Sequence, residues 1–144
     1  MLTKLSKLQS GTLGELLAVA KLNTLGYHAY ISPEGAPGHD AMVLVAGEAK
    51  SIEVKTRQFL NRRSEITRWP VNMLSKGAAA LFMFIELDLR TLEPTFYLLT
   101  NSQAHEAYRE HSGGGSCAPP HVRRLAKPND FSAIELVRLT NPDP

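Results

Sequence analysis

The sequence predicts an α/β or α+β domain with a central mixed β-sheet flanked by helices. Three observations predict it: an apolar helical stripe near the N-terminus, an apolar segment followed by an alternating one within 40–57, and buried segments at 81–87 and 95–99. Taken in order, the expected elements run α-β-β-β-α-β-β-α. Helices and strands arranged in this order pack as layers on one sheet.

The composition is that of one globular domain. Of the 144 residues, 43% are hydrophobic and 21% are charged, and the formal net charge is +2. This usage excludes wholesale disorder, and a domain of this length buries a sizeable core. We find no transmembrane stretch and no signal peptide, so we expect no membrane partner and a cytoplasmic location. The single cysteine, Cys117, excludes an intrachain disulfide and a CxxC zinc site.

The first predicted element is a helix that begins after Ser10 and ends at Gly26. Serine caps helix N-termini, and glycine tolerates the left-handed conformation that often follows a helix. Its apolar stripe consists of Leu13, Leu16, Leu17, Ala20 and Leu25, widened by Ala18, Val19 and Leu22. A short strand is expected at 27–31, followed by a loop at 32–38 with two prolines and two glycines.

The next two strands, 40–45 and 51–57, are predicted to form a β-hairpin. The first strand is almost continuously apolar and the second alternates between apolar and polar residues. A tight turn with residues 47 and 48 at its centre suits the glycine there. In that register, Asp40 lies opposite Lys55.

Two carboxylates and a lysine are therefore expected on one face of the hairpin. Side chains on a strand alternate, so Glu53 and Lys55 share one face while Ile52 and Val54 share the other. Asp40 joins the first group because opposed residues face the same way. Two carboxylates can bind a hard cation such as Mg²⁺, and the lysine can stabilise charge on a phosphate. The alternative from this strand alone is a half-buried strand with a solvated Glu–Lys pair.

Glu15 offers a third carboxylate, from the first helix. Its helical spacing to Ala18 and Leu22 places it toward the edge of the packed stripe, where burial without a partner is costly. The alternative is an exposed glutamate near the helix start, where the helix dipole favours negative charge.

The remaining chain continues the layered pattern and ends in a short tail. The further predicted elements are a weak helix at 71–80, strands at 81–87 and 95–99, and a helix from Asn101 or Ser102 to about Glu110. Three glycines and two prolines make 112–120 a loop that continues neither a helix nor a central strand. We expect one domain over 1–144, with its core at about 8–111 and a tail at 121–144.

These residues, in this order, resemble the PD-(D/E)XK or restriction-endonuclease-like nuclease superfamily. The resemblance rests on Glu15, Gly38-His39-Asp40 and Glu53-Val54-Lys55. It covers about residues 8–100, and His39 stands where the name of the motif has proline. The chain resembles most the small prokaryotic members, such as Holliday-junction-resolvase-like nucleases.

The resemblance implies a metal-dependent nuclease that hydrolyses phosphodiester bonds, with DNA as the expected substrate. It implies Mg²⁺ or Mn²⁺ as the cofactor, bound by Asp40 and Glu53 with the Val54 carbonyl as a further ligand. Glu15 would assist a metal, and Lys55 would act on the attacking water. Many enzymes with this core act as dimers, so a homodimer is a further expectation.

Basic side chains directly after the motif form the expected nucleic-acid-binding surface. The expected contact residues are Arg57, Gln58, Arg62, Arg63 and Arg68. Planar arginine donors suit phosphate, and such contacts set affinity without reading sequence. Trp69 either stacks on an exposed base or packs inside the fold. A second basic group is either a phosphate-contacting arm or a solvated tail, and consists of His121, Arg123, Arg124 and Lys127.

Two other classes of function stay open on the sequence alone. The first is an inactive nuclease-fold module that binds nucleic acid or a protein partner. The second is a plain α/β domain in which Glu53 and Lys55 form a surface ion pair worth under about 1 kcal/mol. The presence of all four polar positions, Glu15, Asp40, Glu53 and Lys55, favours the enzyme.

Overall fold

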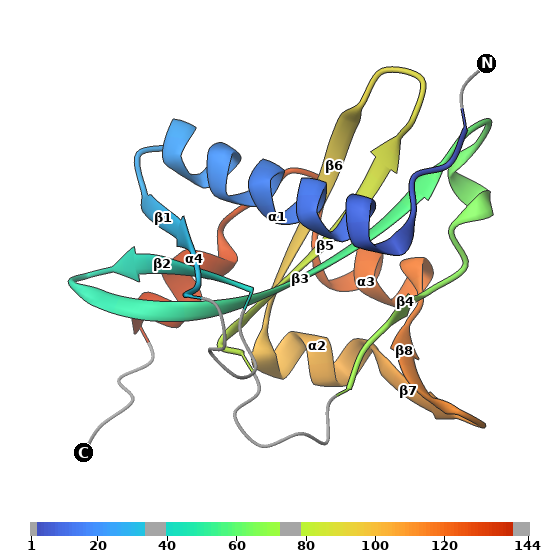
Figure 1. The fold of residues 1–144 in the computed structure, drawn as a ribbon. Coiled ribbons are helices and arrows are strands. Elements are labelled where there is room, and N and C mark those ends of the chain that lie inside the picture. Colours follow the sequence, from blue (N-terminus) through green and yellow to red (C-terminus); the bar gives the residue numbers. More distant parts are fainter. Residues whose placement is uncertain (1–2, 34–39, 73–78, 140–144) are drawn as a thin grey trace.

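The structure, a computed structural model, describes residues 3–33, 40–72 and 79–139 (Figure 1). Its elements are, in order, α1 (Lys7–Thr24), β1 (His28–Ile31), β2 (Ala41–Val45), β3 (Glu48–Phe59), the 3₁₀ turn η1 (Arg63–Glu65), β4 (Trp69–Pro70), β5 (Leu81–Asp88), β6 (Glu93–Thr100), α2 (Asn101–Ala107), β7 (Tyr108–His111), β8 (Gly114–Cys117), α3 (Pro119–Leu125) and α4 (Ala133–Leu139). Most of the helix predicted at 71–80, and most of the loop predicted at 32–38, lie outside the described residues.

A mixed sheet of five strands, in the order β1-β2-β3-β5-β6, forms the centre of the fold (Figure 1). Strands β3 and β5 run parallel, and the other neighbours run antiparallel. The predicted class, a mixed sheet flanked by helices, is confirmed. A second sheet of three strands, β4-β8-β7, was not predicted.

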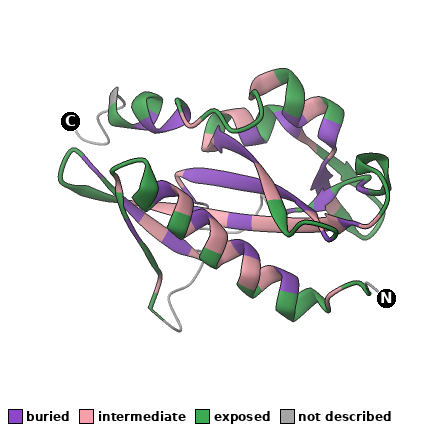
Figure 2. Ribbon diagram, turned by 90° about the horizontal axis from the view of Figure 1, so that it is seen from above, coloured by how far each residue is buried: buried purple, intermediate pink, exposed green. Residues whose placement is uncertain are grey.

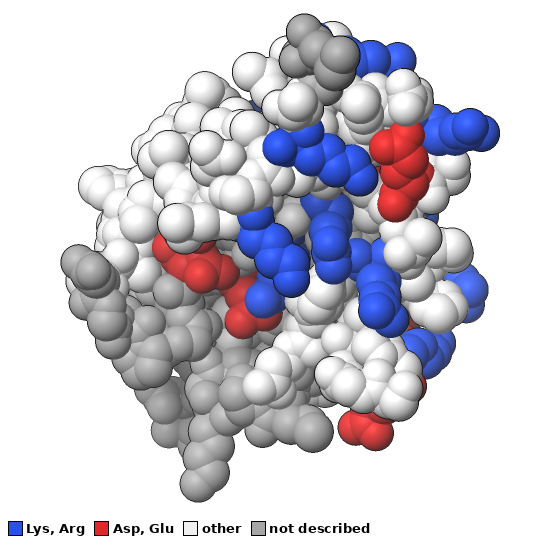
Figure 3. Space-filling model, turned by 45° about the vertical axis from the view of Figure 1, so that its right-hand side comes forward, with Lys and Arg blue, Asp and Glu red and all other residues white. Residues whose placement is uncertain are grey.

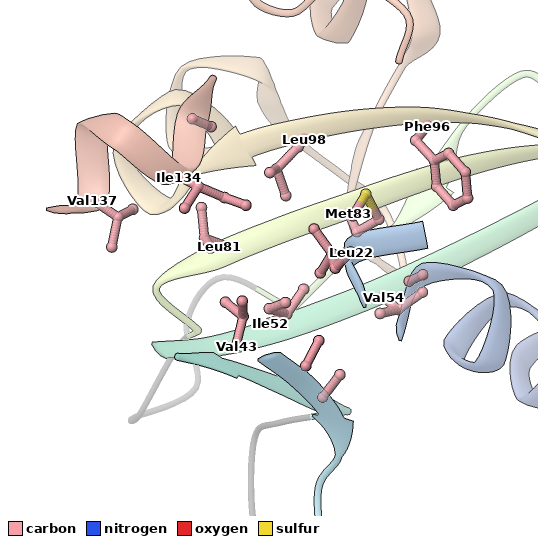
Figure 4. Packing of buried hydrophobic residues seen from close by; sticks show 14 of the residues in the cluster. Leu22, Val43, Ile52, Val54, Leu81, Met83, Phe96, Leu98, Ile134 and Val137 are labelled. Atoms are coloured by element: carbon pink, nitrogen blue, oxygen red, sulfur yellow. The ribbon is translucent and has the colours of Figure 1, made fainter. Parts of the chain in front are cut away.

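Two clusters of buried side chains lie on opposite faces of the main sheet. Along β5, Leu81 and Met83 belong to the first cluster, whereas Phe82 and Phe84 belong to the second. The first cluster joins α1 and α4 to the sheet (Figure 4), and the second joins α2, α3 and the small sheet to it. Figure 2 shows that buried positions concentrate in the central strands. The single domain over 1–144 stays a prediction.

None of the helices in the described residues is long and apolar enough to cross a membrane.

Helix α1 begins earlier than the sequence predicted. Ser6 is its N-cap: the Ser6 hydroxyl accepts a hydrogen bond from the Gln9 N–H, and the Gln9 side-chain oxygen accepts one from the Ser6 N–H. This reciprocal pair is a capping box, which the prediction of Ser10 as the cap overlooked. Ser10 lies buried inside the helix. Gly26 follows the helix at a φ of 96°, as predicted.

Helix α1 packs on the sheet mainly through small residues. The predicted apolar stripe is confirmed only in part, because Ala18 and Leu22 are buried and Leu17 and Val19 pack against the core. The buried positions form one i, i+4 row: Ser10, Gly14, Ala18 and Leu22. The predicted Leu16 is 54% exposed. A methyl group on Gly14 would lie 1.7 Å from Thr56 Oγ1, so the helix lies directly against β3. A prediction that counts only large apolar side chains does not detect that a glycine lets the helix approach the strand closely.

Replacing Gly14 with alanine is expected to destabilise the protein by about 1–3 kcal/mol, because the new methyl group collides with Thr56. Alanine favours a helix over glycine by about 1 kcal/mol, so the collision must exceed that gain. Gly11 is the matched control, since a methyl group there meets nothing within 4 Å. Urea unfolding of both variants measures the difference. Equal stability of the two variants would contradict the close packing of α1 on β3.

The hairpin of β2 and β3 forms as predicted, but its turn does not lie at residues 47 and 48. The central turn residues are Ala46 and Gly47, both with positive φ, at 52° and 83°. This is the combination that a type I′ turn requires. Ala41 therefore pairs with Ile52, and the register differs from the predicted one by two residues. A shift by two keeps each side chain on its predicted face.

The segment after β6 also differs from the prediction. Thr100, rather than Asn101 or Ser102, caps α2 through its hydroxyl, and the helix ends at Ala107. The glycine-rich segment predicted as a loop contains β8, the central strand of the small sheet. Glycine is tolerated in this strand because the ring of Tyr108 covers the space that a side chain at position 115 would fill.

The predicted tail forms two helices that pack on the main sheet. Pro119 and Pro120 begin α3, where proline costs little because the first helical N–H groups have no partner within the helix. Val122 of α3 and Ile134 of α4 are fully buried. Neither the solvated tail nor the phosphate-contacting arm describes this segment, since its apolar residues complete both core clusters.

Candidate functional site

The main sheet has a notch where β2 begins beside β3. Strand β2 pairs with β3 only as far as Ile52, although β3 continues to Phe59. At this point the Asp40 N–H donates to the Ile52 carbonyl at 3.0 Å, and Asp40 Oδ2 accepts from the Val54 N–H at 2.8 Å. The Asp40 carboxylate thus satisfies a backbone donor of β3 that β2 leaves open. Continuing the register by one residue places Asp40 opposite Glu53.

Glu53 and Lys55 lie together on the predicted face of β3. The Lys55 Nζ is 3.9 Å from Glu53 Oε2, and the two side chains are 35% and 19% exposed. A contact this long is weak. The Lys55 ammonium thus lies near the Glu53 carboxylate, and its side chain is partly accessible to a ligand.

Glu15 reaches the same place from α1. Burial raises the pKa of the Glu15 carboxyl, and the negative charge of Asp40 raises it further. Glu15 is thus the partly buried glutamate at the edge of the packed face, and not a solvated residue near the helix start. Because each carboxylate disfavours the charge of the other, a cation beside them would relieve the repulsion.

The donors of the notch fit a hard divalent cation in their chemistry. Carboxylate and carbonyl oxygens are the ligands that Mg²⁺ takes, and Mg²⁺ keeps several of its waters. The Val54 carbonyl faces the notch because the N–H and C=O of a strand residue point to the same neighbour. The described residues hold no group of three or more His, Cys, Asp or Glu arranged around a common point. The fit therefore rests on donor type and charge, at Asp40, Glu53, Glu15 and Val54.

A groove of about 580 Å³ runs from the notch along β3, and we call it the basic groove. It lies between the start of α1 and residues 65–70. Its cations are Lys4, Lys7, Lys55, Arg57 and Arg68. Figure 3 shows Lys and Arg side chains gathered on this side of the molecule, with a few acidic side chains beside and between them. Phosphate groups are the ligands that such a surface attracts.

Among the described residues that line the basic groove, one is acidic, namely Glu65. Its carboxylate is already hydrogen-bonded to backbone N–H groups. Its two oxygens accept hydrogen bonds from the N–H groups of Leu60, Asn61 and Arg62. These bonds lower the pKa of the Glu65 carboxyl. Glu65 therefore fixes the turn after β3, and the groove stays cationic in total.

The structure separates the predicted nucleic-acid contacts into different roles. Arg57 and Arg68 line the basic groove. Gln58 also lines it, but its carboxamide accepts from the Leu5 N–H at 2.9 Å and donates to the Leu5 carbonyl at 2.7 Å. Gln58 thus anchors the segment before α1 through one N–H and the oxygen of its amide, and a role in orienting water or phosphate stays a prediction. Arg62 is exposed and is not among the described lining residues.

Arg63 turns away from the basic groove to a buried carboxylate that the sequence analysis did not single out. Glu86 on β5 is fully buried, and its side chain accepts hydrogen bonds from Arg63 Nη1 at 2.9 Å, from the Tyr97 hydroxyl at 3.2 Å and from Arg123 Nη2. The Arg63 guanidinium also lies over the Phe59 ring. Arg63 and Arg123 therefore hold η1 and α3 against the sheet.

Lys4 and Lys7 were missed as candidate phosphate contacts. In the sequence they are two cations near the N-terminus, far from the Glu53-Val54-Lys55 motif. Only the packing of α1 along β3 places them beside that motif. The capping box at Ser6 was the available signal, because it sets where the helix starts.

Trp69 and Cys117 serve the core. The Trp69 side chain is fully buried, its Nε1 donates to the Ile85 carbonyl at 3.1 Å, and its ring packs on Phe84. The packing alternative for Trp69 is therefore correct. Burial raises the pKa of the Cys117 thiol to about 11, so it stays protonated and inert.

Comparisons with known proteins give matches among solved structures alone. No protein-family model matches the chain, and no curated protein matches it. Eight chains of solved structures match the fold. One is a bacterial homing endonuclease, I-Ssp6803I, with 11% sequence identity, a TM-score of 0.49 and coverage of 67% of each chain. A likeness this remote carries no argument about activity, so the interpretation depends on the site itself.

Proposed function

We propose that the protein is a metal-dependent nuclease that hydrolyses phosphodiester bonds in DNA. The observation that carries the proposal is the position of Lys55. It lies 3.9 Å from the Glu53 carboxylate and also lines the basic groove. A phosphate held in that groove beside Lys55 would therefore lie next to the carboxylates of the notch.

In this proposal Asp40 and Glu53, with the Val54 carbonyl and Glu15, hold Mg²⁺ or Mn²⁺. A bound cation of this kind polarises the scissile phosphate and lowers the pKa of water. The Lys55 ammonium donates a hydrogen bond that orients the attacking water and stabilises the charge that develops on phosphorus-bound oxygens. The other cations of the basic groove hold the backbone without reading its sequence.

The proposal is tested by incubating the protein with supercoiled plasmid, single-stranded DNA and a four-way junction, each with Mg²⁺, Mn²⁺ or EDTA. We expect cleavage that requires metal and falls about 100-fold in Lys55→Ala, because one donor to the developing charge is lost. Lys50→Ala is the matched control on the same strand, since Lys50 pairs with Glu48 instead.

Binding of DNA without cleavage by the wild-type protein would favour the inactive nuclease-fold module. The absence of a preformed three-ligand group among the described residues is the observation that keeps this second candidate. The homodimer belongs to the same proposal, because a dimer with one site in each protomer would cut both strands in one binding event. Sedimentation equilibrium measures it directly.

A further inference from the structure

A second groove, of about 650 Å³, meets the basic groove at Lys55 and Pro70, which line both. We call it the hairpin groove, because the β7–β8 hairpin forms most of its described wall. Its other lining residues include Asn72, Tyr108, Glu110 and His111. A nucleic acid with a phosphate beside Lys55 can therefore extend from one groove into the other.

The two grooves differ in chemistry. Among the described residues that line the hairpin groove, one is a lysine or arginine, namely Lys55. The negative charge of the Glu110 carboxylate balances its positive charge. A continuous phosphate backbone needs several cations along its path, so this groove does not suit one. Tyr108 and His111 instead offer aromatic rings, on which unpaired bases stack.

The wall of the hairpin groove is held in place. The Tyr108 ring lies over Gly115, where a methyl group would fall 1.9 Å from the Tyr108 hydroxyl. The two ring nitrogens of His111 lie 3.1 Å from the Ser112 carbonyl and 3.2 Å from Ser116 Oγ. These contacts fix the imidazole edge, and His111 is an exposed residue.

The hairpin is also fixed relative to Lys55. Strand β8 pairs with β4, with Pro70 opposite Ser116, and Pro70 lines both grooves beside Lys55. A base in the hairpin groove and a phosphate at Lys55 would therefore meet surfaces already held at one spacing. Such preorganisation lowers the entropic cost of binding.

We propose that the hairpin groove binds unpaired nucleobases adjacent to the phosphate held at Lys55. The inference rests on the proposed function and names its substrate class: a DNA duplex with a single-stranded extension. The duplex backbone occupies the basic groove, and the bases of the unpaired strand enter the hairpin groove while its phosphates stay in solvent. A blunt duplex fills only the basic groove, because its bases are paired.

Fluorescence anisotropy in EDTA tests this with three labelled probes: a blunt duplex, the same duplex with a single-stranded extension, and that duplex with an abasic extension of equal length. The abasic probe keeps every phosphate and removes only bases. We expect the base-bearing extension to tighten binding at least about fivefold over both other probes. Equal affinity of the base-bearing and abasic extensions would overturn the inference.

Two variants assign the effect to each groove. His111→Ala is expected to remove most of the gain from the bases and leave the blunt duplex unaffected. Lys7→Ala is expected to weaken all three probes alike, because it removes a phosphate contact. A gain that survives in His111→Ala and in Tyr108→Leu, with both variants folded by circular dichroism, would place the bases elsewhere. Cleavage is measured separately, so loss of the nuclease proposal leaves this binding result intact.

Discussion

Asp40→Asn is expected to lower metal-dependent DNA cleavage by about 1,000-fold while the protein stays folded. The asparagine side-chain oxygen can still accept the hydrogen bond from the Val54 N–H, so the notch keeps its shape. The negative charge that would hold the cation is lost, and a bound cation supplies several kcal/mol of stabilisation to the transition state. Each 1.36 kcal/mol corresponds to about a tenfold change in rate.

The cleavage rate with saturating DNA, the melting temperature and DNA binding in EDTA are the three measurements for this variant. Binding in EDTA should be unchanged or tighter, because a negative charge near the phosphate is removed. Glu48→Gln is the matched control, since Glu48 lies on the same hairpin and is exposed beyond the notch. Cleavage retained in Asp40→Asn would mean that the notch does not hold the metal. Joint loss of cleavage and folding would assign Asp40 a structural role.

The grouping of side chains at the notch could be predicted from the sequence, because it survives an error of two residues in the strand register. The predicted turn was wrong by one position, and the register therefore by two residues. A shift by two leaves Asp40 on the face of Glu53 and Lys55, whereas a shift by one would have reversed it. The alternation along β3 and the continuous apolar run of β5 depend on local pattern alone. Both strands form where predicted, although β3 extends over Glu48–Phe59 instead of 51–57 and β5 over Leu81–Asp88 instead of 81–87.

The basic groove could not be predicted, because it depends on contacts between distant segments. Lys4 and Lys7 reach β3 only because Gly14 allows α1 to lie against Thr56. The apolar strand that contains Glu86 has no basic residue that could pair with its carboxylate. A count of local charge thus assigned Arg63 to nucleic acid, although the fold uses it to neutralise a buried carboxylate.

The double variant Arg63→Met, Arg123→Met is expected to lose about 3–5 kcal/mol of stability, the usual cost of leaving a buried charge without its partners. Both arginines form ion pairs with Glu86, whose side chain is fully buried. Methionine keeps an unbranched apolar stem at each position, so packing near Phe59 and Tyr97 is largely preserved. Urea unfolding measures the loss. Arg90→Met is the control, because its partner Asp88 is 17% exposed whereas Glu86 is fully buried, so water still reaches the carboxylate that loses its arginine.

A third substitution separates the charge from the packing. If the buried carboxylate is the cause of the loss, adding Glu86→Leu to the double variant should restore most of the stability, since an apolar residue of similar volume needs no arginine. A triple variant as unstable as the double one would show that the arginines act through packing alone. The restored variant also bears on the groove, because η1 leads into the segment that carries Arg68. DNA binding that stays weak when stability recovers would show that the Glu86–Arg63 pair itself positions this wall of the basic groove, whereas binding that recovers with stability would show that the wall depends on the stability of the fold alone.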